Sequence, residues 1–435
     1  MKHKFMLPVA LFILAFFSCK KHDTPGPVGK YPADVANDWM QMQIRLTKST
    51  AGYNSVVSDR SFGYAGVAMY EALVPGIPGH RSLLTQIGGP ALLTGKSPEK
   101  YYWPASVNAA MAMLTRNFFE STSPANMASI DSLEAAYTAK FQTEADAEKI
   151  QNAVDYGHLV ATTVFNWSAT DGAHQAYLHI VDPTYTPPVG DGLWVPTFPA
   201  FGPPVHPHWG DNRSFIANIA ASTQPDATIP YSTSPQSPFY QMVNELYTIS
   251  LSLSHEDSVV AKFWGDQPGN LNVPAHATNI LTQLIVKNNL DLGAAAAAYA
   301  LHGIAMNDAS ISVFKTKYQY HQLRPITYIR AIMGHPNWNS VITTPPHPEY
   351  TAAHAVISGA SAAVLEKIFG LNYSFTDHSY DATYGARSYH SFDDYANEAC
   401  RSRLLAGIHF SPSIARGLVQ GRQVGNQVIQ LRINY

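Results

Sequence analysis

Apolar residues recur three and four positions apart in several segments, the spacing that places them on one face of an α-helix. Three segments carry this pattern, at Val35, Trp39, Met42 and Leu46, at Val107, Met111, Leu114 and Phe118, and at Ile150, Val154, Gly157 and Ala161. No segment shows the sustained alternation of apolar and polar residues that indicates a strand. The sequence therefore predicts an all-α fold, a bundle of many helices.

Two longer helices are predicted in the C-terminal half of the chain. The stretch from Asp291 to about Leu323 is rich in Ala and Leu, and the first proline able to stop it is Pro325. A second helix is expected from Thr351 to Phe369. Thr351 would be its N-cap and Gly370 its C-terminal stop.

A proline-rich segment interrupts the helical pattern. Twelve prolines lie in the 56 residues from Pro183 to Pro238, together with Trp194, Phe198, Phe201 and Trp209. Long irregular segments in compact domains are usually functional or disordered, and the aromatic residues favour packing. We expect this segment, residues 181–240, to cover a rim of the helical core. The chain is interpreted as one helical domain over residues 31–435, with N-terminal helices in 31–180 and a core in 241–435.

The composition limits the class of protein. With 46% hydrophobic and 14% charged residues the chain is too apolar to be disordered, and its formal charge of −3 gives no basic surface for nucleic acid. Its two cysteines exclude a disulfide scaffold and any multi-cysteine zinc or iron–sulfur site. Because soluble domains usually carry about 25% charged residues, the surface must rely on neutral polar side chains.

The N-terminus has the layout of a secretory signal. A short basic start precedes an apolar stretch from Phe5 to Phe17, which ends in Ser18 and Cys19. The stretch is too short to span a bilayer comfortably as a helix. Its end resembles the signal of bacterial lipoproteins, so residues 1–18 are interpreted as a signal peptide, Cys19 as the lipidated residue and 19–30 as a tether. This predicts a cell-envelope location with membrane contact only through the lipid; a plain cleaved signal with an incidental cysteine is the alternative.

Three short segments in the last third of the chain carry the candidate chemistry. They are KYQYHQLRP from Lys317, HPEYTAAH from His347 and SRLLAGIH from Ser402. Lys317 and Arg324 are seven residues apart, nearly two turns, and would share one helix face. His354 is expected in the first turn of its helix, where free backbone N–H groups bind anions.

Together the segments favour an oxyanion site. Lys317, Arg324 and Arg403 supply three positive charges, and a tetrahedral oxyanion such as vanadate or phosphate carries up to three negative ones. Histidines 354 and 409 on opposite sides of the anion could divide the work, one bonding the central atom and the other moving protons.

A metal site built from His321, His347 and His354 is the alternative use of these segments. It is disfavoured because Lys317 and Arg324 would repel a metal cation.

These motifs resemble those of the vanadium-dependent haloperoxidases, which share a superfamily with type 2 phosphatidic acid phosphatases and bacterial class A acid phosphatases. The family pattern reads KxxxxxxRP, then PSGH, then SRxxxGxHxxxD. The chain matches the first motif in full, keeps His354 of the second behind Thr-Ala-Ala, and matches the third except for Ser413 in place of Asp. The resemblance is strong from about Ala300 to Ser413 and weaker over residues 35–172.

The resemblance implies a vanadate cofactor and assigns roles to single residues. His409 would bind vanadium, while Lys317, Arg324 and Arg403 would neutralise the vanadate oxygens, and Lys317 would also polarise bound peroxide. His354 would take a proton from hydrogen peroxide.

Four further residues receive roles, Asp266 and His347 from the same resemblance, and Ala353 and Gly407 from their backbone N–H and small size. Asp266 would orient His354, the Ala353 N–H would contact the anion, and Gly407 would let the ligand approach. His347 would mark the halide site, which favours bromide or iodide over chloride. The expected partners are hydrogen peroxide, a halide and a small organic acceptor, and a homo-oligomer stays open.

Two departures from the family pattern predict a weaker site. Ala352 lacks the hydroxyl that would bond an oxyanion oxygen, and Ser413 cannot give His409 the carboxylate support expected of a buried ligand. Two alternatives therefore remain. One is a phosphomonoester hydrolase in which His409 forms a phosphohistidine and His354 protonates the leaving alcohol. The other is a lipoprotein that binds an oxyanion without catalysis.

Overall fold

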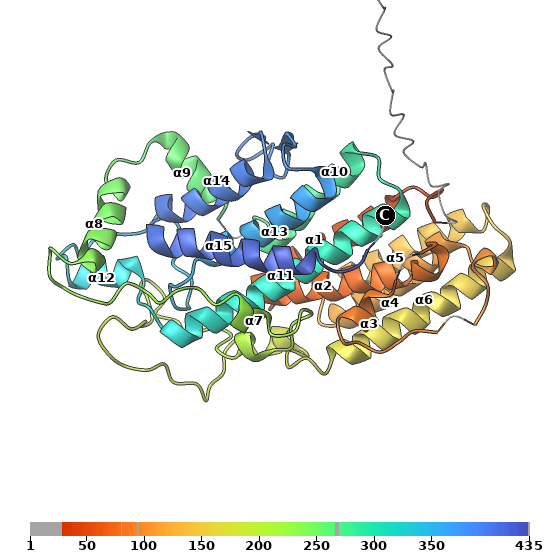
Figure 1. Cartoon of the computed structure of the whole chain (residues 1–435), viewed down its shortest axis with the longest axis horizontal. Coiled ribbons are helices and arrows are strands. Elements are labelled where there is room, and N and C mark those ends of the chain that lie inside the picture. Colours follow the sequence, from red (N-terminus) through yellow and green to blue (C-terminus); the bar gives the residue numbers. More distant parts are fainter. Residues whose placement is uncertain (1–27, 80, 94, 266–268, 434–435) are drawn as a thin grey trace, which may run out of the picture.

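The computed structural model describes residues 28–433 except 80, 94 and 266–268. Within these residues the chain forms fifteen α-helices and one two-stranded antiparallel hairpin, which confirms the predicted all-α fold (Figure 1). The helices are α1 Asp34–Ser49, α2 Ser55–Glu71, α3 Leu83–Gln86, α4 Trp103–Phe118, α5 Pro124–Phe141, α6 Ala147–Ser168, α7 Ile219–Ser222, α8 Pro238–Ser250, α9 His255–Phe263, α10 Val273–Lys287, α11 Leu292–Tyr320, α12 Pro325–Ala331, α13 Ala353–Phe369, α14 Phe392–Leu405 and α15 Ser411–Val428. The strands are β1 Phe375–Asp377 and β2 Arg387–Tyr389.

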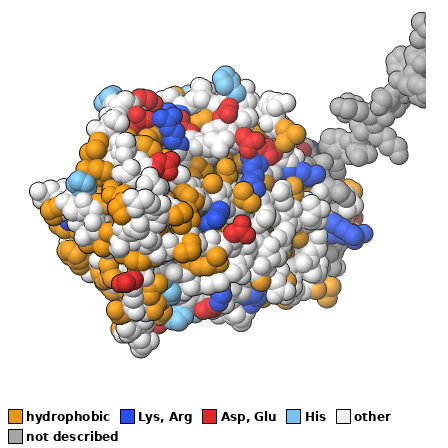
Figure 2. All heavy atoms as spheres, turned by 60° about the vertical axis from the view of Figure 1, so that its left-hand side comes forward, with side chains coloured by type: hydrophobic (Ala, Val, Ile, Leu, Met, Phe, Trp, Pro, Cys, Tyr) orange, Lys and Arg blue, Asp and Glu red, His pale blue; other side chains and the backbone are white. Residues whose placement is uncertain are grey.

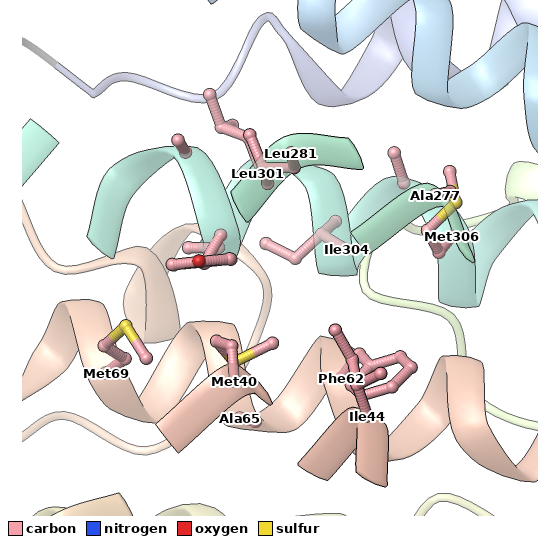
Figure 3. Close-up of a cluster of buried hydrophobic side chains, with 14 of the residues drawn as sticks. Met40, Ile44, Phe62, Ala65, Met69, Ala277, Leu281, Leu301, Ile304 and Met306 are labelled. Atoms are coloured by element: carbon pink, nitrogen blue, oxygen red, sulfur yellow. The ribbon is translucent and has the colours of Figure 1, made fainter. Parts of the chain in front are cut away.

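Helix α11 is the central element of the bundle. It is 29 residues long and buried on nearly all sides, because it packs against α2 on one side and against α13 on the other. Figure 3 shows Leu301 and Ile304 of α11 between Leu281 of α10 and the side chains of α1 and α2. A helix with apolar residues all around, as α11 has, is stable only when neighbours cover it on every side.

The long helix ends about three residues earlier than the sequence predicts. It begins at Leu292, with the Asp291 side chain accepting the Ala294 N–H, and ends at Tyr320. His321 takes a left-handed conformation with φ of 48°, and its N–H donates to the Lys317 carbonyl. The helix therefore ends before Arg324, so Lys317 and Arg324 do not share a helix face.

Helix α13 also starts later than predicted. It begins at Ala353 with Ala352 as N-cap, and no side chain caps it, whereas Thr351 uses its hydroxyl to bond Gln420 of α15. Helices α13 and α15 lie against each other at close range, since a Cβ on Gly421 would sit 1.9 Å from the Val356 carbonyl oxygen. The predicted end at Phe369 and the Gly370 stop are as expected.

The proline-rich segment packs along one edge of the bundle, at the bottom of Figure 1. Trp194 and Trp209 are buried as expected, but Phe198 and Phe201 are exposed on the surface. Two backbone hydrogen bonds join the proline-rich segment to the loops that carry site residues. The Leu323 N–H donates to the Gly192 carbonyl, and the Val205 N–H donates to the Pro346 carbonyl.

The surface is poor in charge, as the composition predicts. Figure 2 shows apolar side chains spread over one end of the molecule among few charged ones. Of the described helices, none combines the length and apolar character needed to cross a membrane. Cys19 and the predicted signal and tether up to residue 27 lie outside the described residues.

Candidate active site

The three sequence segments meet at one end of the bundle. Lys317 lies in the last turn of α11, Arg324 is the N-cap of α12, and Arg403 lies in the last turn of α14. His354 is in the first turn of α13, and His409 precedes α15. The side chains of Lys317, Arg324, Arg403 and His409 are almost completely buried.

Of these residues, His354, Arg403 and His409 line a cavity of about 500 Å³, whereas Lys317 and Arg324 lie outside its lining, with Arg324 bonded to His409 and His347 of the wall. Ala353, His354, Arg403 and His409 line one part of its wall, together with His347. Helix α13 begins at this wall, so its uncapped N-terminus, which carries partial positive charge, lies beside the cationic side chains. The cavity therefore has a strongly electropositive part.

The carboxylate that supports His409 comes from Glu349. The His409 Nδ1–H donates to Glu349 Oε1 at 2.8 Å, and the Phe410 N–H donates to the same oxygen at 3.1 Å. Nε2 then carries the lone pair, and it accepts a hydrogen bond from Arg324 at 3.1 Å. This corrects the expectation that His409 lacks carboxylate support because Ser413 replaces the family's Asp.

Ser413 lies close to Glu349 and makes no hydrogen bond to His409. Burial raises the pKa of the Glu349 carboxyl, while Lys317, Arg324, the Phe410 N–H and the Ser413 hydroxyl oppose this rise. Glu349 stands in the HPEYTAAH segment, but no sequence pattern links it to His409, which is 60 residues away. An acidic residue inside one of the three motif segments was the only sign in the sequence that Glu349 belongs to the site.

Lys317 and Arg324 are held by uncharged groups. The Lys317 ammonium donates to the carbonyls of Pro348 and Glu349, both at 2.9 Å. Arg324 donates to the carbonyls of His347 and Ile408. In the described part of the chain, neither cation has a carboxylate oxygen within 4 Å, so their charges are only partly balanced.

Burial lowers the pKa of both groups. Burial and the neighbouring Arg324 lower the pKa of Lys317 well below its usual value, and Glu349 opposes this. Burial lowers the pKa of Arg324 to about 10, again against Glu349, so the guanidinium stays charged at neutral pH. An anion bound beside these groups would stabilise their charged forms.

A backbone carbonyl positions His354 and Arg403 together. The His354 Nε2–H and one Arg403 amino group both donate to the Trp264 carbonyl oxygen at 2.8 Å. Because Nε2 carries the proton, Nδ1 is the basic nitrogen of His354. Burial and the Arg403 charge lower the pKa of His354 well below 6.5, which keeps the ring neutral at pH 7. Asp266, predicted to orient His354, lies outside the described residues.

The other predicted site residues take different places. His347 lines the cavity, accepts a hydrogen bond from Arg324 at its Nδ1 and lies beside the Phe314 ring. Gly407 has φ of 76° and packs against the Trp338 ring, which accounts for the glycine, while the next two residues reach the cavity. His321 is not part of the wall.

The donor set fits a four-oxygen anion and does not fit a metal cation. Lys317 and Arg324 are buried beside one carboxylate, Glu349, among the residues described, and buried charge of one sign is costly without a counter-ion. Over the described ranges, no group of three or more His, Cys, Asp or Glu could hold a metal ion. His409 Nε2, with its lone pair directed at this cationic region, is placed to bond the central atom of an oxyanion.

Comparisons with known proteins agree with this site. The family model described as VCPO second helical-bundle domain matches residues 297–435, which include all three motif segments. No curated protein sequence matches.

Solved structures match over nearly the whole chain. A structure described as the first bacterial vanadium-dependent iodoperoxidase is 28% identical, with a TM-score of 0.78 over 92% of this chain and 96% of that one. Apo and holo forms of a bacterial vanadium-dependent chloroperoxidase are 17% and 16% identical, with TM-scores of 0.68 and 0.67. They cover 86% and 88% of this chain and 92% and 93% of theirs, and show the same fold. Together with the motif residues gathered beside one electropositive cavity, these matches support an assignment of this chain to the vanadium-dependent haloperoxidase family.

Proposed function

We propose that the protein is a vanadate-dependent peroxidase that oxidises iodide or bromide with hydrogen peroxide. The observation that carries the proposal is His409, whose Nδ1–H is fixed by a buried carboxylate and whose Nε2 faces a cluster of buried cations. Similarity to an iodoperoxidase at 28% identity supports iodide. His347 on the cavity wall, rather than an aromatic residue, supports the choice of iodide or bromide over chloride.

Each site residue has a role that its contacts allow. Bound vanadate would supply the activation of peroxide toward attack by halide. Lys317, Arg324 and Arg403 would neutralise its oxygens, the α13 N-terminus would add the Ala353 N–H, and His409 would hold it through Nε2. Arg324, which already donates to that nitrogen, would keep the imidazole oriented in the absence of anion.

His354 is the proposed acid–base residue. Its Nε2–H bond to the Trp264 carbonyl fixes the ring, and its low pKa keeps the ring neutral at pH 7, the form that a base toward hydrogen peroxide requires. His354 would later return the proton it accepts to the peroxide oxygen that leaves as water. Arg403, held by the same carbonyl, couples the position of this base to the position of the anion.

The test is halide oxidation by purified protein loaded with orthovanadate. We expect triiodide to form from iodide and hydrogen peroxide only when vanadate is present, with slower bromide oxidation and no chloride oxidation. His409→Ala is the matched negative control. Absence of halide oxidation in the fully loaded protein would refute the proposal.

The same preparation distinguishes the remaining alternatives. Hydrolysis of 4-nitrophenyl phosphate that vanadate inhibits would indicate the phosphomonoester hydrolase, with His409 as the nucleophile and His354 as the acid. Phosphate binding without either activity would indicate an oxyanion-binding protein. Glu349 would support His409 in all three cases, so the reaction assays rather than the geometry separate them.

We further propose that the protein is a lipoprotein of the bacterial cell envelope, anchored through Cys19. The signal layout and the Ser18-Cys19 pair support this. Mass spectrometry of the N-terminal peptide from membranes of the expressing cell should find an acylated Cys19. A Cys19→Ser variant should leave the membrane fraction. An unmodified Cys19 in the mature chain would refute the anchor.

A further inference from the structure

The cavity beside His409 is much larger than the inorganic substrates need. It measures about 500 Å³, within the range of pockets that enclose organic ligands, whereas one water molecule occupies roughly 30 Å³. Vanadate, peroxide and a halide ion would occupy only the part beside the charged residues. The remaining volume requires another explanation.

That remaining part has an apolar wall. Its lining residues come from the start of α2 and of α10, from the proline-rich segment, from α11 and α13, and from the loop before His347. The apolar members are Val56, Val205, Val273, Phe314, Ile342 and Ile357. An apolar wall of this kind next to a few directed polar groups is typical of a small-molecule site.

The polar groups of the wall are neutral. His206 accepts a hydrogen bond at Nε2 from the Asn54 amide at 2.7 Å, and burial lowers its pKa to about 4, so it carries no charge at neutral pH. The wall also carries the side-chain amide of Asn54 and the hydroxyl of Thr344. A charged ligand would lose its hydration here without gaining a counter-charge, so the wall selects against ions.

One aromatic side chain connects the two parts of the cavity. Phe314 lines the wall, and its ring lies 5.4 Å from that of His347 and 6.4 Å from that of His206, measured between ring centroids. A flat ring stacked on Phe314 would therefore lie between the apolar wall and the residues proposed to act on halide. Aromatic pairs of this kind add to the affinity that apolar burial supplies.

We propose that the apolar part of the cavity binds a neutral, electron-rich aromatic molecule and that halogenation occurs while this molecule is bound. The proposal rests on the proposed peroxidase function and adds a substrate class to it. For iodide the balanced reaction is ArH + I⁻ + H₂O₂ + H⁺ → ArI + 2 H₂O. Peroxide is reduced, iodide loses two electrons, the C–I bond forms at the ring, and the ring proton is released.

The consequence that can be measured is selectivity. Hypoiodous acid released into water iodinates a phenol at the positions that its own electronics favour. An acceptor held against Phe314 presents some ring positions to the oxidised halogen and hides others. We therefore expect the ortho-to-para product ratio for phenol to differ between the vanadate-loaded enzyme and reagent hypoiodous acid, and the rate to saturate with phenol.

Substitution at Val273 tests the location. Val273→Trp would fill the apolar part from the start of α10, and Val286→Trp, on the exposed side near the end of α10, is the matched control. The KM for phenol should rise about tenfold or more in Val273→Trp, which is the scale of a misfitted apolar pocket, and stay unchanged in the control. Triiodide formation without phenol should be similar in both.

Nitrobenzene gives a second measurement that needs no substitution. Its ring is too electron-poor to be iodinated, but it matches the size and neutrality of the proposed ligand. It should inhibit phenol iodination competitively and leave triiodide formation unchanged. A product ratio equal to that of reagent hypoiodous acid, or no inhibition by nitrobenzene, would overturn the proposal. Absence of triiodide in every preparation would instead refute the peroxidase function.

Discussion

Replacing Glu349 by glutamine tests how the site holds its anion. The substitution keeps the size and shape of the side chain but removes its charge. The carboxylate oxygen that now accepts from both His409 Nδ1 and the Phe410 N–H becomes a neutral amide oxygen. His409 thereby loses the charge that makes its Nε2 a strong donor toward the central atom of an oxyanion.

The size of the effect follows from that contact. A hydrogen bond to a charged group contributes about 1.5–3 kcal/mol, and about 1.4 kcal/mol corresponds to a tenfold change in Kd. The vanadate Kd should therefore rise about 10- to 100-fold, the usual range for losing the partner of a metal-binding histidine. A second contribution has the same sign, because Glu349 opposes the fall in the pKa of Lys317 and its removal favours the neutral amine.

An opposite effect competes with these two. Removal of a buried negative charge makes the cavity more positive, which by itself would tighten anion binding. We expect the direct contact to dominate, since the Glu349 oxygen lies 2.8 Å from His409 Nδ1 and that ring would bond the anion itself.

Equilibrium dialysis with orthovanadate, followed by elemental analysis of bound vanadium, measures the Kd directly. Ser413→Ala is the comparison, because the Ser413 hydroxyl makes no hydrogen bond to Glu349 or His409, so its loss should weaken binding far less. Ser413→Asp restores the family's motif but places a second carboxylate beside Glu349, so it should not tighten binding. Unchanged or tighter vanadate binding in Glu349→Gln, with the fold intact by circular dichroism, would refute this reasoning.

Three further predictions follow from other parts of the structure. His409→Ala should abolish vanadium retention in dialysis, whereas His354→Ala should lower kcat about 100-fold or more and change vanadate affinity much less; equal losses would contradict an acid–base role. Burial lowers the pKa of His302 to about 3, so below about pH 6.5 the unfolded chain binds more protons than the folded chain. The free energy of unfolding therefore decreases as the pH is lowered. Denaturant titrations from pH 7 to pH 5 should give His302→Asn a shallower slope than wild type by about 1 kcal/mol per pH unit averaged over this range, and equal slopes would disprove this. Gly421→Ala should cost about 1–3 kcal/mol in the same titrations at pH 7, because its Cβ would overlap the Val356 carbonyl, whereas Gly202→Ala, with open space around it, should stay within about 0.5 kcal/mol; similar values for both would show that the helices separate easily.

Helical periodicity was sufficient to predict much of the fold. The predicted apolar positions of α1, α4 and α6 lie within helices and are buried or partly buried, because the spacing of three and four residues is a local property of the chain. The ends of the helices were predicted less accurately. The end of α11 depends on His321 adopting a left-handed conformation and on the proline-rich segment bonding the residues after it, and neither is encoded within one helical turn.

Side-chain chemistry read along the chain was enough to indicate which reactions the site can carry. The cations, the two histidines and their order in three motifs follow from side-chain chemistry and resemblance alone, and they pointed to an oxyanion before any contact was known. Which groups orient the two histidines depends on contacts that form only in the folded protein. Glu349 meets His409 across 60 residues, and the Trp264 carbonyl fixes His354 across 90, because distances between remote segments are set by how whole helices pack and not by local pattern. The same packing leaves the large apolar cavity beside the charged groups, which no sequence motif marks.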